Sequence, residues 1–83
     1  MDIHCELFGT LGCHLCETAE QVLQPFVAQG LIVELRDIID SADWLERYAL
    51  TIPVLRRIDN GQELNWPFTE HEVYQLLHQP ADH

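Results

Sequence analysis

Two cysteines three positions apart are the residues of this chain best suited to chemistry. Cys13 and Cys16 follow a short apolar run and a glycine-containing loop, at the start of a long helical pattern. At this spacing their sulfurs can bond to each other, and the unpaired N–H groups of a helix N-terminus favour a thiolate over a thiol. The pair therefore predicts a reversible dithiol, while the same spacing alone would equally serve a metal ion.

The length and composition predict one small globular domain spanning residues 1–83, with residues 79–83 as a frayed tail. Apolar residues make up 47% of the chain and charged residues 22%, as in ordinary globular proteins. No apolar run approaches the roughly 20 residues that cross a bilayer. The first residues lack the basic and apolar segments of a signal peptide, so we expect a cytoplasmic protein. In that compartment cysteines are more often catalytic, metal-binding or buried than structural disulfides.

The charge of the chain excludes some classes of partner. Fourteen acidic residues face four basic ones, all arginines, and the formal net charge is −10. Nucleic acids and anionic membranes require clustered positive charge, so neither is expected as a partner. The acidity suits either simple solubility or a protein partner with a basic face.

Periodicity and turn residues predict the element order β-α-β-α-β-β-α. Strands are expected over residues 3–8, 31–35, 52–58 and 63–66. Helices are expected over residues 13–29, after a cap at Asp40 or Ser41, and after Thr69. A strand–helix–strand unit makes the first two strands parallel. The Asp-Asn-Gly sequence at 59–61 predicts an antiparallel hairpin between the last two strands.

The ends of the helices are marked by particular residues. Gly30 is placed to end the first helix, and Pro25 should kink that helix or interrupt its hydrogen bonding. Thr69 and Glu72 have the spacing of a capping box. The first helix also carries an apolar stripe that we expect to be buried, made of Leu15, Ala19, Val22, Leu23, Phe26 and Val27.

This element order, with Cys-x-x-Cys at the first strand-to-helix junction, resembles the thioredoxin fold in its glutaredoxin form. The tetrapeptide Thr-Ile-Pro-Val at 51–54 is a second point of resemblance, because glutaredoxins carry Thr-hydrophobic-Pro-hydrophobic at that place. The chain looks closest to small bacterial glutaredoxin-like proteins with a Gly-Cys-x-Leu-Cys motif. The resemblance spans nearly the whole chain. It implies an α/β fold with a four-stranded mixed sheet in the order 2-1-3-4, flanking helices, and a cis proline beside the dithiol.

The resemblance also implies an activity, that of a thiol–disulfide oxidoreductase. Cys13 would be the exposed nucleophile and Cys16 the more buried resolving thiol. Thr51, Ile52 and Pro53 would bind the extended chain of a substrate, which would be a protein or small-molecule disulfide. The protein would act as a monomer without a built-in cofactor or metal.

Departures from the glutaredoxin pattern bear on the electron donor. Glutaredoxins usually carry Pro-Tyr between the cysteines, whereas this chain has His14 and Leu15. Residues 66–70 stand where glutaredoxins commonly have Gly-Gly followed by an aspartate that holds glutathione. Glutathione is therefore a candidate donor for which we expect weak binding. A protonated His14 would add positive charge beside the Cys13 thiolate and make the disulfide more oxidising.

Two alternative functions use the same residues differently. A metal carrier would bind its ion through Cys13 and Cys16, and a tetrahedral zinc site would need further ligands from elsewhere in the chain. A binding module would keep the fold without catalysis. The third cysteine, Cys5, lies in the first strand pattern on the side of Ile3 and Leu7, where we expect it to be buried and inert.

Overall fold

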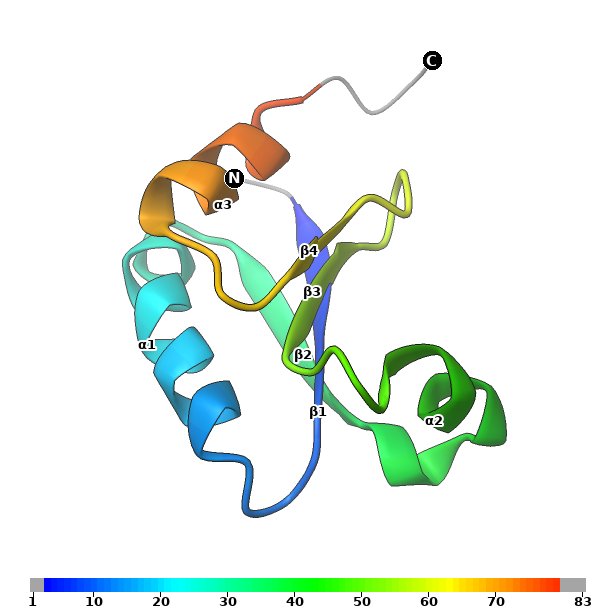
Figure 1. Cartoon of the computed structure of the whole chain (residues 1–83). Helices are drawn as coiled ribbons and strands as arrows, with labels where there is room; N and C mark the ends of the chain where they lie inside the picture. The colour runs from blue at the N-terminus through cyan, green and yellow to red at the C-terminus, as the bar shows by residue number, and fades with distance from the viewer. Residues whose placement is uncertain (1–2, 80–83) are drawn as a thin grey trace.

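A four-stranded mixed sheet forms the centre of the molecule (Figure 1), seen in a computed structural model that describes residues 3–79. The elements are β1 (His4–Gly9), α1 (His14–Ala28), β2 (Ile32–Asp37), the 3₁₀ helix η1 (Ile38–Asp40), α2 (Ala42–Tyr48), β3 (Val54–Arg57), β4 (Glu63–Asn65) and α3 (Glu70–Leu77). The strand order is β2-β1-β3-β4, with β1 parallel to β2 and antiparallel to β3, and β3 antiparallel to β4. The predicted element order, strand order and strand directions are confirmed.

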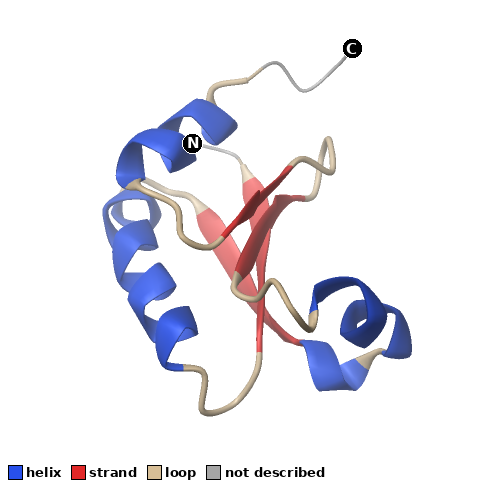
Figure 2. Cartoon of the chain, in the orientation of Figure 1, coloured by secondary structure: helices blue, strands red, loops and turns tan. Residues whose placement is uncertain are grey.

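Alternate residues of β1 point to opposite faces of the sheet, and each face has its own core. Cys5 and Leu7 belong to the larger core, which β1 shares with α1 and α3. Phe8 belongs to the smaller core under α2, where its ring stacks on Tyr48 and meets Trp44 edge to face. Figure 2 accordingly shows α1 and α3 on one side of the sheet and α2 on the other.

The C-terminus of α1 is closed by a glycine, as predicted. Gly30 has a φ of 108°, a left-handed conformation that glycine adopts without a steric penalty. Its N–H donates to the Val27 carbonyl, and the Leu31 N–H donates to the Phe26 carbonyl, both at 3.0 Å. These are the two bonds of a Schellman motif. The helix itself runs through Pro25 as one element.

The other predicted caps and the hairpin turn are also present. Ser41 caps α2, and Thr69 with Glu72 forms the reciprocal capping box of α3. In the turn between β3 and β4, Gly61 has a φ of 74° and donates its N–H to the Arg57 carbonyl. These features form where predicted because each involves residues only a few positions apart.

The predicted stripe of α1 was wrong at its two ends. Leu15 and Val27 are exposed, whereas the buried residues of this helix are Cys16, Ala19, Leu23 and Phe26. Those four recur at helical spacing and define the line that faces the sheet. Leu15 and Val27 each lie one position beyond that line, so they rotate away from the core and toward solvent.

The third and fourth strands are shorter than predicted. The segment 52–58 was expected as a strand, but β3 begins at Val54, after a cis bond between Ile52 and Pro53. Similarly, β4 ends at Asn65, and a second cis bond follows between Trp66 and Pro67 that the sequence analysis did not predict. Of the tail expected over 79–83, residues 80–83 lie outside the described part of the chain.

A buried arginine joins the β3–β4 hairpin to the end of α3. The Arg57 guanidinium donates to the Leu76 carbonyl at 2.8 Å and to the Gln79 carbonyl at 3.0 Å. Its other nitrogens donate to both oxygens of Asp59, at 2.9 and 2.6 Å. The last carbonyls of a helix lack partners within the helix, so this cation satisfies them and offsets the negative end of the helix dipole.

Candidate active site

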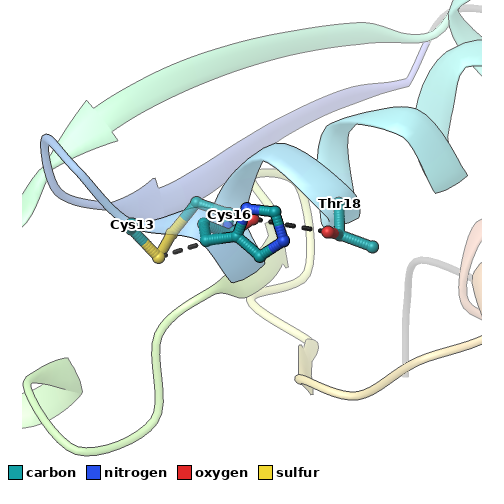
Figure 3. Close-up of a disulfide and its surroundings, with 4 residues drawn as sticks. Cys13, Cys16 and Thr18 are labelled. Atoms are coloured by element: carbon teal, nitrogen blue, oxygen red, sulfur yellow. Dashed lines mark hydrogen bonds between the residues drawn. A yellow bond between two sulfur atoms is a disulfide. The ribbon is translucent and has the colours of Figure 1, made fainter.

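The two motif cysteines are joined as a disulfide at the N-terminus of α1 (Figure 3). Their Cα atoms are 5.2 Å apart, an ordinary separation for a disulfide. Cys13 is the N-cap of the helix, and its sulfur accepts a hydrogen bond from the Cys16 N–H at 3.1 Å. The first N–H groups of a helix have no partners within the helix, so the sulfur occupies the place of a capping oxygen.

The two motif cysteines differ in exposure as predicted, because Cys16 is more buried than Cys13. Cys16 is buried at 8% exposure, and Cys13 is half-buried at the edge of the loop that follows β1. His14 is exposed, and its carbonyl accepts the hydrogen bond from the Thr18 hydroxyl that is drawn in Figure 3. An incoming molecule therefore has better access to Cys13 than to Cys16.

Gly9 is a site residue whose role the sequence analysis missed. It ends β1 and is buried directly against Cys16. A Cβ atom added at Gly9 would lie 2.7 Å from the Cys16 sulfur and 3.3 Å from the Cys16 Cβ, closer than ordinary van der Waals contact. The absence of a side chain at this position therefore makes room for the disulfide. A glycine before a motif is too common a feature to have revealed this contact.

The predicted cis bond before Pro53 is confirmed. The segment leading to it is held by the C-terminus of α2, because the N–H groups of Thr51 and Ile52 both donate to the Tyr48 carbonyl, at 2.9 and 3.1 Å. The Thr51 hydroxyl donates to the same carbonyl at 3.3 Å. On the other side, the Trp66 N–H donates to the Pro53 carbonyl at 3.0 Å. That the proline lies beside the dithiol stays a prediction.

These bonds change what Ile52 could offer to a substrate chain. Its N–H is already used within the protein, whereas no described residue donates to its carbonyl. The carbonyl is therefore the backbone group of Ile52 available to an incoming N–H. Thr51 and Ile52 are half-buried and Pro53 is buried, so access to this segment is restricted.

A cavity of about 300 Å³ borders the disulfide on the side of β2. Both motif cysteines line it, together with the loop at 10–12 and residues of β1, α1 and β2. Its lining includes the apolar Leu7 and Leu35 and the acidic Glu17 and Glu20. This cavity could not be predicted from the sequence, because it forms between elements that are far apart along the chain.

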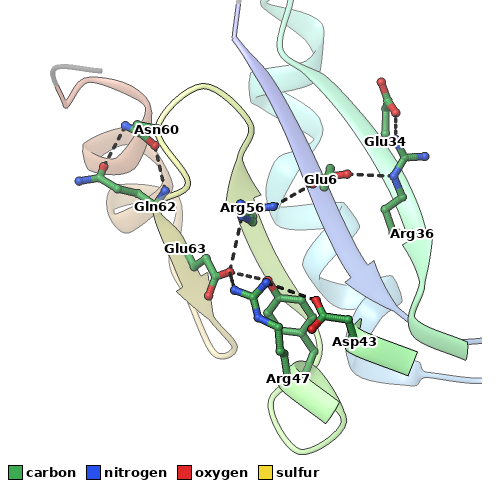
Figure 4. A network of polar contacts seen from close by, with 10 residues as sticks. Glu6, Glu34, Arg36, Asp43, Arg47, Arg56, Asn60, Gln62 and Glu63 are labelled. Atoms are coloured by element: carbon green, nitrogen blue, oxygen red, sulfur yellow. Dashed lines mark hydrogen bonds and ion pairs between the residues drawn. The ribbon is translucent and has the colours of Figure 1, made fainter. Parts of the chain in front are cut away.

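All four arginines are engaged by carboxylates. Figure 4 shows three of them in a network on the α2 side of the sheet, where the ion pairs are Arg36 with Glu6 and Glu34, Arg56 with Glu6 and Glu63, and Arg47 with Asp43 and Glu63. The fourth, Arg57, is paired with Asp59 as described above. Within residues 3–79, which include all four arginines, no guanidinium is thus left without a carboxylate partner.

The third cysteine lies apart from this chemistry. Cys5 is a free thiol with no exposed surface, as predicted, in the core shared with α1 and α3. Burial raises its pKa to about 11, and the nearby Arg57 guanidinium opposes that shift only in part. Cys5 therefore remains a neutral thiol at physiological pH, which makes it a poor nucleophile.

Within residues 3–79, no three side chains of His, Cys, Asp or Glu are grouped so that they could hold a metal ion. None of the helices in that part of the chain is long and apolar enough to cross a membrane.

The βαβαββα order, the four-stranded mixed sheet and the Cys-x-x-Cys disulfide at the start of α1 define a thioredoxin fold of the glutaredoxin-like kind. The model of the family described as "Glutaredoxin-like domain (DUF836)" matches residues 4–78, so the chain belongs to this glutaredoxin-like family. The resemblance inferred from the sequence is thereby confirmed.

Two solved structures of a protein from X. campestris, the structural genomics target XcR50, are similar to this chain. The X-ray structure is 32% identical, covers 92% of this chain and 99% of its own, and superposes with a TM-score of 0.78. The solution structure of the same target is also 32% identical, covers 92% and 95% respectively, and has a TM-score of 0.72. The similarity therefore extends over nearly the whole of both proteins.

Proposed function

We infer that this protein is a thiol–disulfide oxidoreductase that uses Cys13 as nucleophile and Cys16 as resolving thiol. The observation that carries the proposal is the disulfide at the N-cap of α1, with the Cys16 N–H donating to the Cys13 sulfur at 3.1 Å. In the reduced protein the same N–H favours the Cys13 thiolate over the thiol. The pKa of that thiol should therefore lie below the ordinary value of about 8.5.

The reaction transfers two electrons from the dithiol to a substrate disulfide. The Cys13 thiolate attacks one substrate sulfur, forms a mixed disulfide and releases the other sulfur as a thiolate, which takes a proton from solvent. Cys16 loses its proton and attacks the Cys13 sulfur, which releases the second substrate thiolate and forms the Cys13–Cys16 disulfide. An external thiol reductant then returns the protein to the dithiol state.

The segment at 51–53 is proposed to position the substrate. An extended substrate chain would donate an N–H to the Ile52 carbonyl, since the N–H of Ile52 is bonded to Tyr48. Thr51 would act through its bonds to the same Tyr48 carbonyl, which hold the segment in place. Pro53 has no N–H and its carbonyl accepts the Trp66 N–H, so it would present only its ring to the site.

The external reductant is proposed to be a reductase or a thiol. Glutathione stays a candidate, but we propose that it binds only weakly. Glutathione is an anionic tripeptide, and each arginine of this chain already has a carboxylate partner. The net charge of −10 also disfavours an anionic ligand. We further propose that the protein works as a monomer in the cytoplasm, on protein or small-molecule disulfides.

The test is capture of a model disulfide by single-cysteine variants, followed by mass spectrometry. Cys16→Ser should accumulate a stable mixed disulfide, because no second thiol remains to release it. Cys13→Ser should capture nothing, and Cys5→Ser should behave as the parent protein does. Capture by Cys13→Ser at the parent rate would overturn the assigned roles. Zinc or copper that survives desalting of the reduced parent would instead favour the metal carrier.

A further inference from the structure

The cavity beside the disulfide has an apolar floor. Leu7 of β1 and Leu35 of β2 are direct neighbours in the parallel pairing of these strands, and both line the cavity. Leu35 is 60% exposed, because β2 is the edge strand of the sheet. The cavity therefore offers an aliphatic surface that begins at the sulfurs and opens toward the free edge of β2.

Unpaired carboxylates stand along one wall of this cavity. Glu17 and Glu20 are three positions apart on α1, which places them on the same face of the helix. Neither forms an ion pair with any residue in the range 3–79, in contrast to the carboxylates of the sheet network. Glu17 is exposed and Glu20 is half-buried, so both charges remain available to a ligand.

The other charged residues of the cavity do not cancel this negative charge. Arg36 contributes to the lining, but its guanidinium is bound by Glu6 and Glu34. The Asp37 carboxylate accepts the Ile39 N–H at 3.1 Å and caps η1. The cavity thus combines an aliphatic floor, an unpaired acidic wall and the reactive sulfurs at one end.

The cavity is also separate from the segment at 51–53. None of these three residues is among those that line it. In the sheet, β1 lies between β2, which borders the cavity, and β3, which follows Pro53. A substrate joined to Cys13 as a mixed disulfide could therefore contact the segment at 51–53 and the cavity at the same time.

We propose that this cavity binds a cationic aliphatic group of the substrate, such as a lysine or arginine side chain next to the cysteine that is attacked. The aliphatic stem would lie against Leu7 and Leu35, and the charged end would meet Glu17 and Glu20. A volume of about 300 Å³ is at the small end of ligand sites, which suits one side chain rather than a large cofactor. This inference rests on the proposed function and names its substrate class.

The test compares two disulfides that differ only in charge. Cystamine carries an ammonium at the end of each two-carbon arm, and bis(2-hydroxyethyl) disulfide carries a hydroxyl there. The fully reduced protein is mixed with each, and each rate is divided by the rate of the uncharged thiol dithiothreitol with the same disulfide. That division removes the difference in leaving-group reactivity. Work at 0.15 M salt limits the influence of distant charges.

The proposal predicts that the parent prefers cystamine, and that Glu17→Gln with Glu20→Gln reduces this preference about tenfold. Each exposed ion pair lost contributes about threefold, which is within the range for such pairs. Because the preference is a ratio of two rates on one protein, a change in the Cys13 pKa cancels from it. The matched control is Glu46→Gln with Glu70→Gln, which changes the net charge equally on α2 and α3.

Three results separate the possible failures. An unchanged preference in Glu17→Gln/Glu20→Gln would overturn the cavity as the binding site. An equal loss in the control pair would overturn it as well, because the net charge of the protein would then explain the preference. If the parent reacts with neither disulfide faster than Cys13→Ser does, the proposed function itself fails.

Discussion

Replacing Gly9 with alanine should make the Cys13–Cys16 disulfide easier to reduce. The new Cβ would stand 2.7 Å from the Cys16 sulfur, where ordinary contacts begin near 3.4 Å. In the oxidised protein the sulfur is bonded to Cys13 and cannot rotate away, whereas in the reduced protein the Cys16 side chain is free to turn. The clash therefore costs the oxidised state more than the reduced state.

The size of the effect follows from the cost of overpacking a buried site, typically about 1–3 kcal/mol. For a two-electron couple 1.4 kcal/mol corresponds to about 30 mV, so the reduction potential should rise by about 20–60 mV. Gly9 has no positive φ, so alanine at this position adds the contact without left-handed backbone strain. The potential is measured by equilibrating the protein in dithiothreitol redox buffers, alkylating the free thiols and weighing the products.

Gly12→Ala provides the control from the same loop. Its φ is 76° and a Cβ there would meet nothing within 4 Å, so alanine should strain the backbone in both redox states alike. This variant should lose about 1 kcal/mol of stability and keep the parent potential. A Gly9→Ala protein that folds and keeps the parent potential would refute the argument. So would equal losses of stability in its oxidised and reduced forms.

Three other predictions follow from the structure. In the reduced native protein at pH 8, iodoacetamide should label Cys13 rapidly and Cys5 only after unfolding, because burial raises the pKa of Cys5 to about 11; labelling of both at similar rates would contradict this. The hydrogen bond from Arg57 lowers the pKa of Asp59 below its usual 3.8. The stabilisation that this pair gives the folded protein is therefore complete above pH 3.8 and is lost as the pH falls through the lowered pKa. Urea unfolding at pH 7 and at pH 3 should therefore differ less for Asp59→Asn than for the parent protein, and an equal difference would count against the pair. Glutathione at low millimolar concentration should leave the amide chemical shifts of Cys13, Ile52 and Trp66 unsaturated, whereas saturating shifts would show that paired arginines do not prevent binding.

Much of the fold could be predicted from the sequence because it depends on short-range interactions. The capping box of Thr69 and Glu72 and the Gly61 turn each involve residues within four positions of one another. The element order follows from periodicities that are equally local. The order of the strands and the cis bond before Pro53 were carried by the family resemblance instead, and both are confirmed.

The sequence also identified the cysteine pair, since two sulfurs three positions apart at a helix start are close enough to bond to each other. The buried residues of α1 were predicted less exactly, because hydrophobic periodicity was the only basis for that prediction. The ends of the buried line on α1 depend on how the helix is rotated against the sheet, and that rotation placed Leu15 and Val27 toward solvent.

The surroundings of the dithiol were decided by tertiary structure alone. Gly9 meets Cys16 because the end of β1 passes beneath the first turn of α1, and Leu7 and Leu35 become neighbours only when two strands pair in parallel. The charges of the arginines are engaged by carboxylates distant in the sequence, such as Glu6, which is 30 positions from Arg36. Contacts of this kind depend on the packing of whole elements. Local sequence therefore determined where the cysteine pair lies, and the packed fold determined what surrounds it.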